Sequence, residues 1–355
     1  MTIKHSENIR ALSEFARSES ASTAQQQAAK PTGFRNAQAT FSPSLLENLA
    51  ILRRFLFEKP EHARPAGSIP AQELSRAELL AAPNQTGYRL GHSTLLFKLQ
   101  NQFFLTDPVF SERASPLALA GPKRFHDTPL SIEELPELAA IILSHDHYDH
   151  LDRAAIRALH QKTRLFLCPL GVGQHLRNWG VPADKITELN WWQSHQLGDL
   201  RFSATPAQHF SGRGLRDHNQ TLWCSWVIQD QQTHLFFSGD TGYFPGFKEI
   251  AAKFKYFDLS FIETGAYDKA WPDVHMLPEQ SLQAHLDLNA RYMMPIHNST
   301  FDLGLHNWFE PLDRISALAE QSQVLLSTPI IGAGFDLNEP QRGSAWWQSP
   351  QVRGF

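Results

Sequence analysis

The six-residue run His145-Asp146-His147-Tyr148-Asp149-His150 constrains this chain more than any other feature of its sequence. It follows directly after residues 139–143, an uninterrupted apolar stretch typical of a buried strand. In the loop that leaves such a strand, His145 and His147 can point the same way and hold one metal ion. Asp149 and His150 can then address a second ion beside the first. A histidine-rich surface loop is the alternative, but so dense a set of ligand-type side chains at a strand end favours a metal site.

Three further candidate ligands stand at the ends of later apolar segments. They are His209 after residues 202–207, Asp240 in a glycine-flanked turn, and His297 after residues 292–296. Strand tips are where folds commonly deliver functional side chains. Each residue alone is more often a cap or a hydrogen-bonding residue at the edge of the core. The repeated placement is what favours one shared site.

Composition narrows the class of protein. The chain has 355 residues, of which 42% are hydrophobic, and a net charge of -4, so it can bury a large core and shows no basic stripe. Cys168 and Cys224 lie in apolar segments and are expected to be buried strand residues rather than a disulfide framework. The N-terminus lacks the apolar segment of a signal peptide, and no stretch is long enough to span a bilayer. We therefore expect a cytoplasmic protein, with peripheral contact at the inner membrane face as an alternative.

The chain divides into four predicted parts. Residues 1–40 are polar and aperiodic, which predicts a flexible N-terminal arm. Residues 41–86 are expected to form a helical extension packed on the core, 87–340 the main domain, and 341–355 a C-terminal tail. Within the extension, the spacing of apolar residues predicts a helix over 44–57 with Ser44 as its cap. Packing on the main domain is the favoured interpretation of this helix, and a membrane-surface or substrate-entry helix is the alternative.

Strands and helices alternate through the main domain. We predict one strand over 88–99, joined by a tight turn at Gln100-Asn101 to a second over 103–106. Hairpins come early and strand–helix alternation comes later, which indicates an α/β fold of mixed sheets covered by helices.

Several segments together resemble a known family. The run 145–152 resembles the metallo-β-lactamase superfamily signature. The flanking segments 91–94, 105–110, 113–116, 121–125 and 238–243 are similar to those of N-acyl-phosphatidylethanolamine-hydrolysing phospholipase D. The resemblance extends from about Leu45 to about Phe335. It implies a four-layer αβ/βα sandwich with two divalent metal ions at one edge, zinc being favoured over manganese or iron.

The resemblance also implies a ligand set. One metal would take His145, His147 and His209, and the other would take Asp149, His150 and His297. Asp240 would bridge the two ions, and Asp107 would orient a ligand histidine.

The expected activity is hydrolysis of a phosphodiester by a hydroxide that bridges the metals, with a phospholipid or related lipid as substrate. Asp149 would help to orient the hydroxide. His275, on the loop before a predicted helix at Pro278, is a candidate proton donor to the leaving group, or simply a loop residue. A lactonase or other C–O ester hydrolase is the alternative enzyme, and a nuclease is a weaker one because it would need a basic groove. A non-catalytic metal-binding protein is weaker still, since structural zinc sites are closed and rich in sulfur. We expect a small-molecule or lipid substrate and no nucleic acid, and the oligomeric state stays open.

Overall fold

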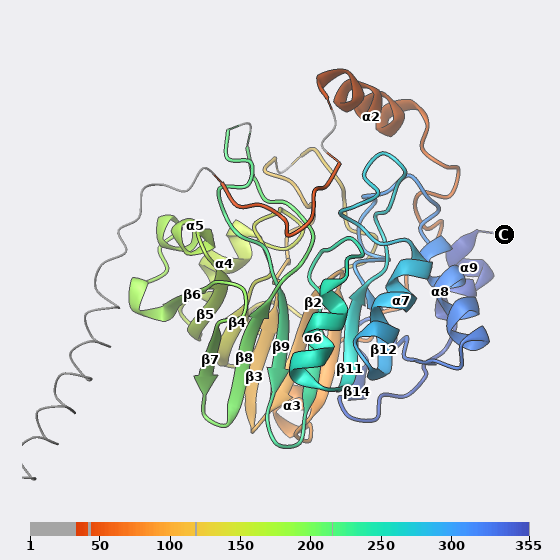
Figure 1. Ribbon diagram of the computed structural model, residues 1–355. Helices are drawn as coiled ribbons and strands as arrows, with labels where there is room; N and C mark the ends of the chain where they lie inside the picture. The colour runs from red at the N-terminus through yellow and green to blue at the C-terminus, as the bar shows by residue number, and fades with distance from the viewer. Residues whose placement is uncertain (1–32, 42–43, 118, 215, 355) are drawn as a thin grey trace, which may run out of the picture. The chain divides into compact units, whose positions relative to one another are not determined.

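Two seven-stranded sheets form the centre of the protein. The computed structural model describes residues 33–41, 44–117, 119–214 and 216–354, and Figure 1 shows its ribbon. The first sheet has the order β14-β1-β2-β3-β4-β5-β6 and the second the order β13-β12-β11-β10-β9-β8-β7. The strands of the first sheet are β1 (Thr86–Gly91), β2 (Thr94–Leu99), β3 (Gln102–Thr106), β4 (Leu138–Ile142), β5 (Thr163–Pro169), β6 (Ile186–Leu189) and β14 (Gly334–Asp336). Those of the second are β7 (Ser194–Leu197), β8 (Leu200–Thr205), β9 (Ser225–Gln229), β10 (His234–Phe237), β11 (Phe257–Glu263), β12 (Ala290–Ile296) and β13 (Leu325–Leu326).

Helices cover the outer face of each sheet. The helices are α2 (Leu45–Phe57), α3 (Arg76–Ala81), α4 (Arg153–Leu159), α5 (Val172–Asn178), α6 (Gly246–Phe254), α7 (Pro278–Asp287), α8 (Glu310–Gln321) and α9 (Pro350–Arg353), with short 3-10 turns at Ala183–Lys185 and Trp346–Gln348. One apolar cluster joins the first sheet to α3, α4 and α5, and another joins the second sheet to α6, α7 and α8. A third lies between the sheets and includes Phe97 and Phe104 from one and Phe237 and Phe261 from the other. The predicted four-layer αβ/βα sandwich is confirmed.

The direction of the strands brings their ends together. β3, β4 and β5 run parallel in the first sheet, and β10, β11 and β12 run parallel in the second. β9 is antiparallel to both β8 and β10, so β8 points the same way as β10. The carboxyl ends of the parallel strands therefore meet at one edge of each sheet, which is where α/β folds place their sites.

The predicted strand over 88–99 is wrong, because the structure divides it into β1 and β2. The chain reverses at Gly91-His92-Ser93, and the two strands pair antiparallel. Gly91 has φ +132° and His92 has φ +49°, so neither can continue an extended strand. Strand-like apolar residues lie on both sides of the turn, and the prediction ran across the four residues between them, Gly91-His92-Ser93-Thr94. The helix predicted over 44–57 matches α2, in which Ser44 and Glu47 form a capping box.

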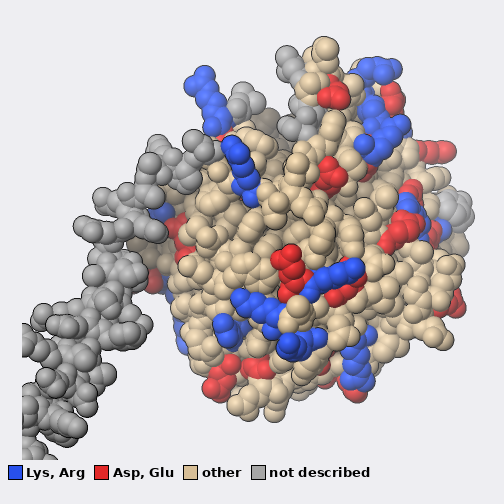
Figure 2. Space-filling model, viewed as in Figure 1, with Lys and Arg blue, Asp and Glu red and all other residues tan. Residues whose placement is uncertain are grey.

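The described surface shows mixed charge on the face drawn in Figure 2, where Lys and Arg are interspersed with Asp and Glu. This face carries no continuous basic stripe of the kind that binds a nucleic-acid backbone. Among the described residues, no helix has both the length and the apolar character that crossing a bilayer requires. Both predicted cysteines, Cys168 and Cys224, are buried and free.

The indole of Trp226 on β9 connects the two sheets beside the loop that carries the histidine run. Trp226 is fully buried, and its Nε1 donates a hydrogen bond of 2.9 Å to the carbonyl of Leu143, two residues before His145. We expect Trp226→Phe to lower the free energy of unfolding by about 1–3 kcal/mol, because it leaves that buried carbonyl without its donor. Urea denaturation measures the change. Trp192→Phe, at a half-buried indole, is the matched control and should cost less; equal losses would contradict the prediction.

Candidate metal centre

The seven predicted ligands come together where strands of both sheets end. Four of them lie on the loop between β4 and α4, and the other three follow strands of the second sheet. The loop residues are His145, His147, Asp149 and His150; His209 follows β8, Asp240 follows β10 and His297 follows β12. Their donor atoms form two adjacent groups of the size that holds a metal ion.

The first group consists of His145, His147, His209 and Asp240, whose donor atoms all lie within 4.8 Å of one another. His147 Nδ1 is 2.9 Å from His145 Nε2 and 3.2 Å from His209 Nε2. Asp240 Oδ2 lies 3.9 Å from the Nε2 atoms of both His145 and His209. Three ring nitrogens and one carboxylate oxygen thus converge, a donor set that suits zinc.

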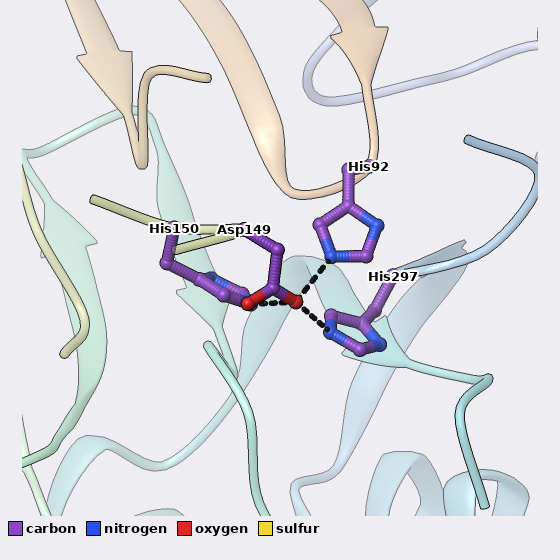
Figure 3. Close-up of side chains that lie close together, drawn as sticks. All are labelled: His92, Asp149, His150 and His297. Carbon is purple, nitrogen blue, oxygen red and sulfur yellow. Dashed lines mark hydrogen bonds and ion pairs between the residues drawn. The ribbon is translucent and has the colours of Figure 1, made fainter. Parts of the chain in front are cut away.

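The second group is drawn in Figure 3 and contains His92, Asp149, His150 and His297. Asp149 Oδ2 lies 3.0 Å from His92 Nε2, 3.2 Å from His297 Nε2 and 3.5 Å from His150 Nε2. Asp240 reaches this group too. Its Oδ1 is 3.0 Å from His150 Nε2 and its Oδ2 is 3.0 Å from His297 Nε2. Asp240 therefore stands between the two groups, in the place expected of a bridging ligand.

Hydrogen bonds on the far side of the rings fix which nitrogen faces the centre. His145 Nδ1 lies 2.9 Å from Ser144 Oγ, and His209 Nδ1 lies 2.9 Å from the carbonyl of Val274. His150 Nδ1 lies 2.7 Å from Asp107 Oδ2. In each ring the Nε2 atom is left to point inward. Asp107 occupies the position expected of a residue that orients a ligand histidine.

The sequence analysis assigned no role to His92. The side chain is buried at the reversal between β1 and β2, and its backbone carbonyl accepts a hydrogen bond from the N–H of His297. Recognising Gly91-His92-Ser93 as a turn would have placed His92 at a strand tip, like the other site residues. The error in the strand prediction is therefore also the reason why this imidazole was missed.

Backbone strain is concentrated at this edge of the sheets. His92, Asp107 and His297 have φ values of +49°, +33° and +60°, in the left-handed region that side chains disfavour. Such conformations cost about 1–3 kcal/mol each and persist where the surroundings impose them, often at functional sites. Gly239, just before Asp240, has φ +56°, and a Cβ there would lie 2.5 Å from Ser144 Cβ. Only glycine fits this position.

The buried groups of the site have strongly shifted pKa values. Burial and the neighbouring imidazoles lower the pKa of His145 and His209, which keeps these rings neutral. Burial opposes ionisation of Asp149 and Asp240, but the imidazoles around them hold the pKa of both carboxyls well below the usual range. Burial likewise opposes a charge on His297, yet Asp240 and Asp149 raise its pKa to about 10. Neutral imidazoles and ionised carboxylates are the forms that bind metals, so a cation bound at this site would have to displace the protons that the raised pKa values place on His297 and His150.

The residues present therefore fit metal ions. His150 Nε2 and Asp240 Oδ1 are buried and, among the described residues, have no hydrogen-bond partner of good geometry. Both atoms point at the space that the two groups share. Unsatisfied buried donors and acceptors are costly, and a divalent cation would satisfy both.

Comparisons with known proteins agree with this geometry. Residues 102–298, more than half of the chain, match a family model described as a beta-lactamase superfamily domain. The chain belongs to the metallo-β-lactamase superfamily. An uncharacterized protein of Mycobacterium tuberculosis is 42% identical over 316 residues, covering 85% of this chain and 82% of the relative. N-acyl-phosphatidylethanolamine-hydrolyzing phospholipase D 1 of Caenorhabditis elegans is 37% identical over 256 residues, covering 68% of this chain and 72% of the relative.

The solved structures that resemble this superfamily member support its fold. The isothiocyanate hydrolase from Delia radicum gut bacteria superposes with a TM-score of 0.58 at 21% identity, covering 72% of this chain and all of that structure. The metallo hydrolase Igni18 from Ignicoccus hospitalis gives 0.53 at 17% identity, with 70% and 96% covered. The chain is thus a metal-dependent hydrolase of this superfamily, with His and Asp clusters able to bind metal ions.

A cavity of about 620 Å³ opens onto the metal centre of this superfamily hydrolase. Its floor includes the ligand candidates His147, Asp149, His209, Asp240 and His297. Apolar side chains form much of its wall: Phe41, Ile51, Phe210, Trp271, Val274 and Leu303. The metal centre is therefore accessible to a small molecule and has apolar surroundings, unlike the closed site of a structural zinc.

His275 also lines this cavity, and a buried glutamate holds it. His275 Nδ1 lies 2.5 Å from Glu263 Oε1, so Nε2 is the ring nitrogen left free to act. Glu263 Oε2 accepts a hydrogen bond of 2.6 Å from the N–H of Thr241, next to Asp240. Burial raises the pKa of the Glu263 carboxyl, and His275 partly offsets this effect. Glu263 was not predicted; its position at the end of β11, among the other strand tips, is the signal that could have found it.

Asn36 also contacts the metal centre. Its side-chain amide donates a hydrogen bond of 2.8 Å to the carbonyl of His209 and accepts one of 3.0 Å from the N–H of His209. Trp223 Nε1 donates to the same amide oxygen at 3.0 Å. This paired contact fixes the backbone of a candidate ligand from a segment that has no regular secondary structure of its own.

We expect Asn36→Ala to weaken zinc binding about 10- to 100-fold while leaving the fold intact, because His209 loses both backbone hydrogen bonds. Competition with a chromophoric chelator measures the affinity. Asn338→Ala, at an amide on the opposite part of the chain that bonds Gln85, is the matched control. A zinc affinity equal to that of the wild type would contradict the role assigned to Asn36.

Proposed function

We propose that this hydrolase cleaves a phosphodiester, with a phospholipid of the N-acyl-phosphatidylethanolamine type as the favoured substrate. The observation that carries the proposal is the shared carboxylate of Asp240 between two donor groups on the floor of an apolar cavity. Two cations close together suit in-line displacement at phosphorus. The apolar wall suits an acyl chain. The relative in Caenorhabditis elegans is named for hydrolysis of such a lipid, and so is a mitochondrial protein of Saccharomyces cerevisiae that is 36% identical over 226 residues.

The proposal places two divalent ions, zinc being favoured, one on each donor group. When bound, they would supply a hydroxide at neutral pH and offset negative charge on the phosphoryl oxygens. His145, His147 and His209 would hold one ion, and Asp149, His150 and His297 the other. Asp240 would bridge them and set their spacing. The free oxygen of Asp149 would accept a hydrogen bond from the attacking nucleophile and orient it.

His275 is proposed to protonate the leaving group. Its Nδ1 is bonded to Glu263, which fixes the tautomer and aims Nε2 into the cavity. A proton delivered from Nε2 would neutralise the departing alkoxide of an alkyl phosphodiester. Glu263, fully buried, would position the imidazole; because Nδ1 already bonds Glu263, delivery of a proton from Nε2 requires a hydrogen on that nitrogen when the substrate binds.

Two substrates whose leaving groups differ in basicity test the role proposed for His275. The zinc-loaded protein should hydrolyse both bis(p-nitrophenyl) phosphate and N-acyl-phosphatidylethanolamine. His275→Gln should lower kcat about 100-fold or more on the lipid, whose alkoxide needs a proton. It should lower kcat less than about tenfold on the nitrophenyl diester, whose leaving group needs none.

Elemental analysis is the control, since His275→Gln must keep the metal content of the wild type. Equal losses on both substrates would show that His275 is not the proton donor. Failure of the wild type on every phosphodiester, with turnover of sugar or acyl lactones, would favour the lactonase alternative instead.

The exposed face of α2 is proposed to touch the lipid surface from which the substrate comes. α2 packs on the cavity wall through Phe55, stacked on Trp271 with 5.6 Å between ring centroids, and through the Arg54–Asp268 ion pair. Its other side presents apolar side chains that are all more than half exposed: Leu46, Leu49, Leu52 and Phe57. Figure 1 shows α2 beyond the edge of the sandwich where the strand ends meet. A helix with this apolar face suits the interface of a bilayer.

We expect Leu46→Asp combined with Leu49→Asp to reduce binding to phospholipid vesicles at least about tenfold, because charge would replace two exposed leucines that enter the bilayer interface. Co-sedimentation with phosphatidylethanolamine-containing vesicles measures the binding. Activity on bis(p-nitrophenyl) phosphate, which is water-soluble, should not change. Leu286→Asp, at an exposed leucine on α7, is the control; an equal loss there would argue against a specific role for α2.

A further inference from the structure

A second cleft lies on the other side of the metal-binding loop. It encloses about 640 Å³ between the segment that follows β3, the start of α4 and the end of α5. It shares no lining residue with the cavity over the metal centre. Tyr148 lines it, whereas the flanking residues His147 and Asp149 line the metal cavity. The same short loop therefore forms a wall of both spaces.

The cleft is lined by positive charge. Four guanidinium groups face it, those of Arg113, Arg153, Arg157 and Arg213; the imidazole of His175 is also in the lining, 3.3 Å from the carboxylate of Asp146. Among the described residues, neither Arg153 nor Arg157 forms an ion pair with a carboxylate. Both side chains are exposed and stand one helical turn apart on α4. Two like charges in this arrangement repel each other, and an anion bound between the two guanidinium groups would remove that repulsion.

The two carboxylates of the cleft are already engaged. Glu112 pairs with Lys123 at 2.7 Å. Asp152 caps α4 by accepting hydrogen bonds from the N–H groups of Ala154 and Ala155, and its other oxygen accepts from Phe110 and Ser111. These contacts use both oxygens of Asp152. The positive charge of Arg153 and Arg157 is therefore not paired with either carboxylate.

Arg213 makes the wall rigid and connects it to the metal loop. Its guanidinium stacks over the ring of Tyr148 at 4.0 Å and over that of Trp179 at 5.1 Å. Nη1 donates hydrogen bonds to the carbonyls of Asp146, at 2.5 Å, and Leu151, at 2.8 Å. Arg213 therefore clamps both ends of the metal-binding loop while it faces the cleft.

We propose that this arginine-lined cleft binds a phosphate monoester, as a site separate from the metal centre. Guanidinium groups match phosphate oxygens in geometry and keep their charge. Several guanidinium groups together favour a doubly charged phosphate over a singly charged carboxylate as the ligand. Arg153 and Arg157 are the groups that contact the phosphate, and Arg213 is a fixed part of the wall. The source of the phosphate is either a lipid headgroup or a small soluble molecule. Phosphate binding in this cleft would be independent of the reaction at the metal centre, because the two spaces share no lining residue.

Calorimetric titration of the zinc-loaded protein with glycerol 3-phosphate tests the site. Arg153→Ala combined with Arg157→Ala should weaken binding at least about tenfold, because two charge-assisted contacts are lost. Arg153→Lys with Arg157→Lys should retain an intermediate affinity, since charge remains without the planar fork. Arg164→Ala, at an exposed arginine on β5 away from the cleft, is the matched control and should bind like the wild type.

Vesicles distinguish the two sources of phosphate. Binding to phosphatidylcholine vesicles that requires added phosphatidic acid, and is lost in the double alanine variant, would identify a lipid headgroup. Binding of glycerol 3-phosphate alone, with the same dependence on Arg153 and Arg157, would identify a soluble ligand. The proposal is wrong if neither ligand binds. It is also wrong if the double alanine variant binds glycerol 3-phosphate as tightly as the wild type, because the phosphate would then bind at the metal centre instead.

Discussion

The candidate metal centre depends on the contacts that the carboxylate of Asp240 makes with imidazoles of both sheets. Asp240 follows β10 of the second sheet and contacts His297 from the same sheet and His150 from the first. A buried carboxylate costs several kcal/mol unless opposite charge compensates it, and here imidazoles from both sheets do so. The two layers of the sandwich are therefore held in register at this edge. A small slip of one sheet would leave a buried charge unpaired.

The convergence of the candidate ligands could be predicted from sequence because each of them follows an apolar strand. The run 145–150 indicated a metal site at the end of one apolar segment. Three further candidates follow other apolar segments in the same way: His209, Asp240 and His297. The parallel strands then bring these tips to one edge, which the alternation of strands and helices already indicated. His92 was missed because a single strand was predicted across the tight reversal at residues 91–93, so that its strand end was not recognised.

Other parts of the site have a weak local sequence signal or none. Asn36 lies in a polar segment, and nothing in its neighbours indicates that its amide would meet the backbone of His209. Glu263 ends a strand, but an acidic residue in that place is equally often a cap. The arginine-lined cleft is assembled from α4, the loop after β3 and Arg213, which come together only in the folded chain. Contacts of this kind depend on tertiary packing, which residue patterns along one segment do not record.

The hydrogen bonds between Asn36 and the backbone of His209 can form only after the chain has been synthesised as far as His209. Asn36 and His209 are 173 positions apart, so Asn36 leaves the ribosome long before His209 and Trp223 exist. The entropy of closing so long a loop grows slowly, by about 0.6 kcal/mol per doubling, so late docking costs little. A segment made before His209 thus takes its place only after His209 has been made. A protease cut or a fused tag near residue 36 would loosen a ligand without disturbing the core.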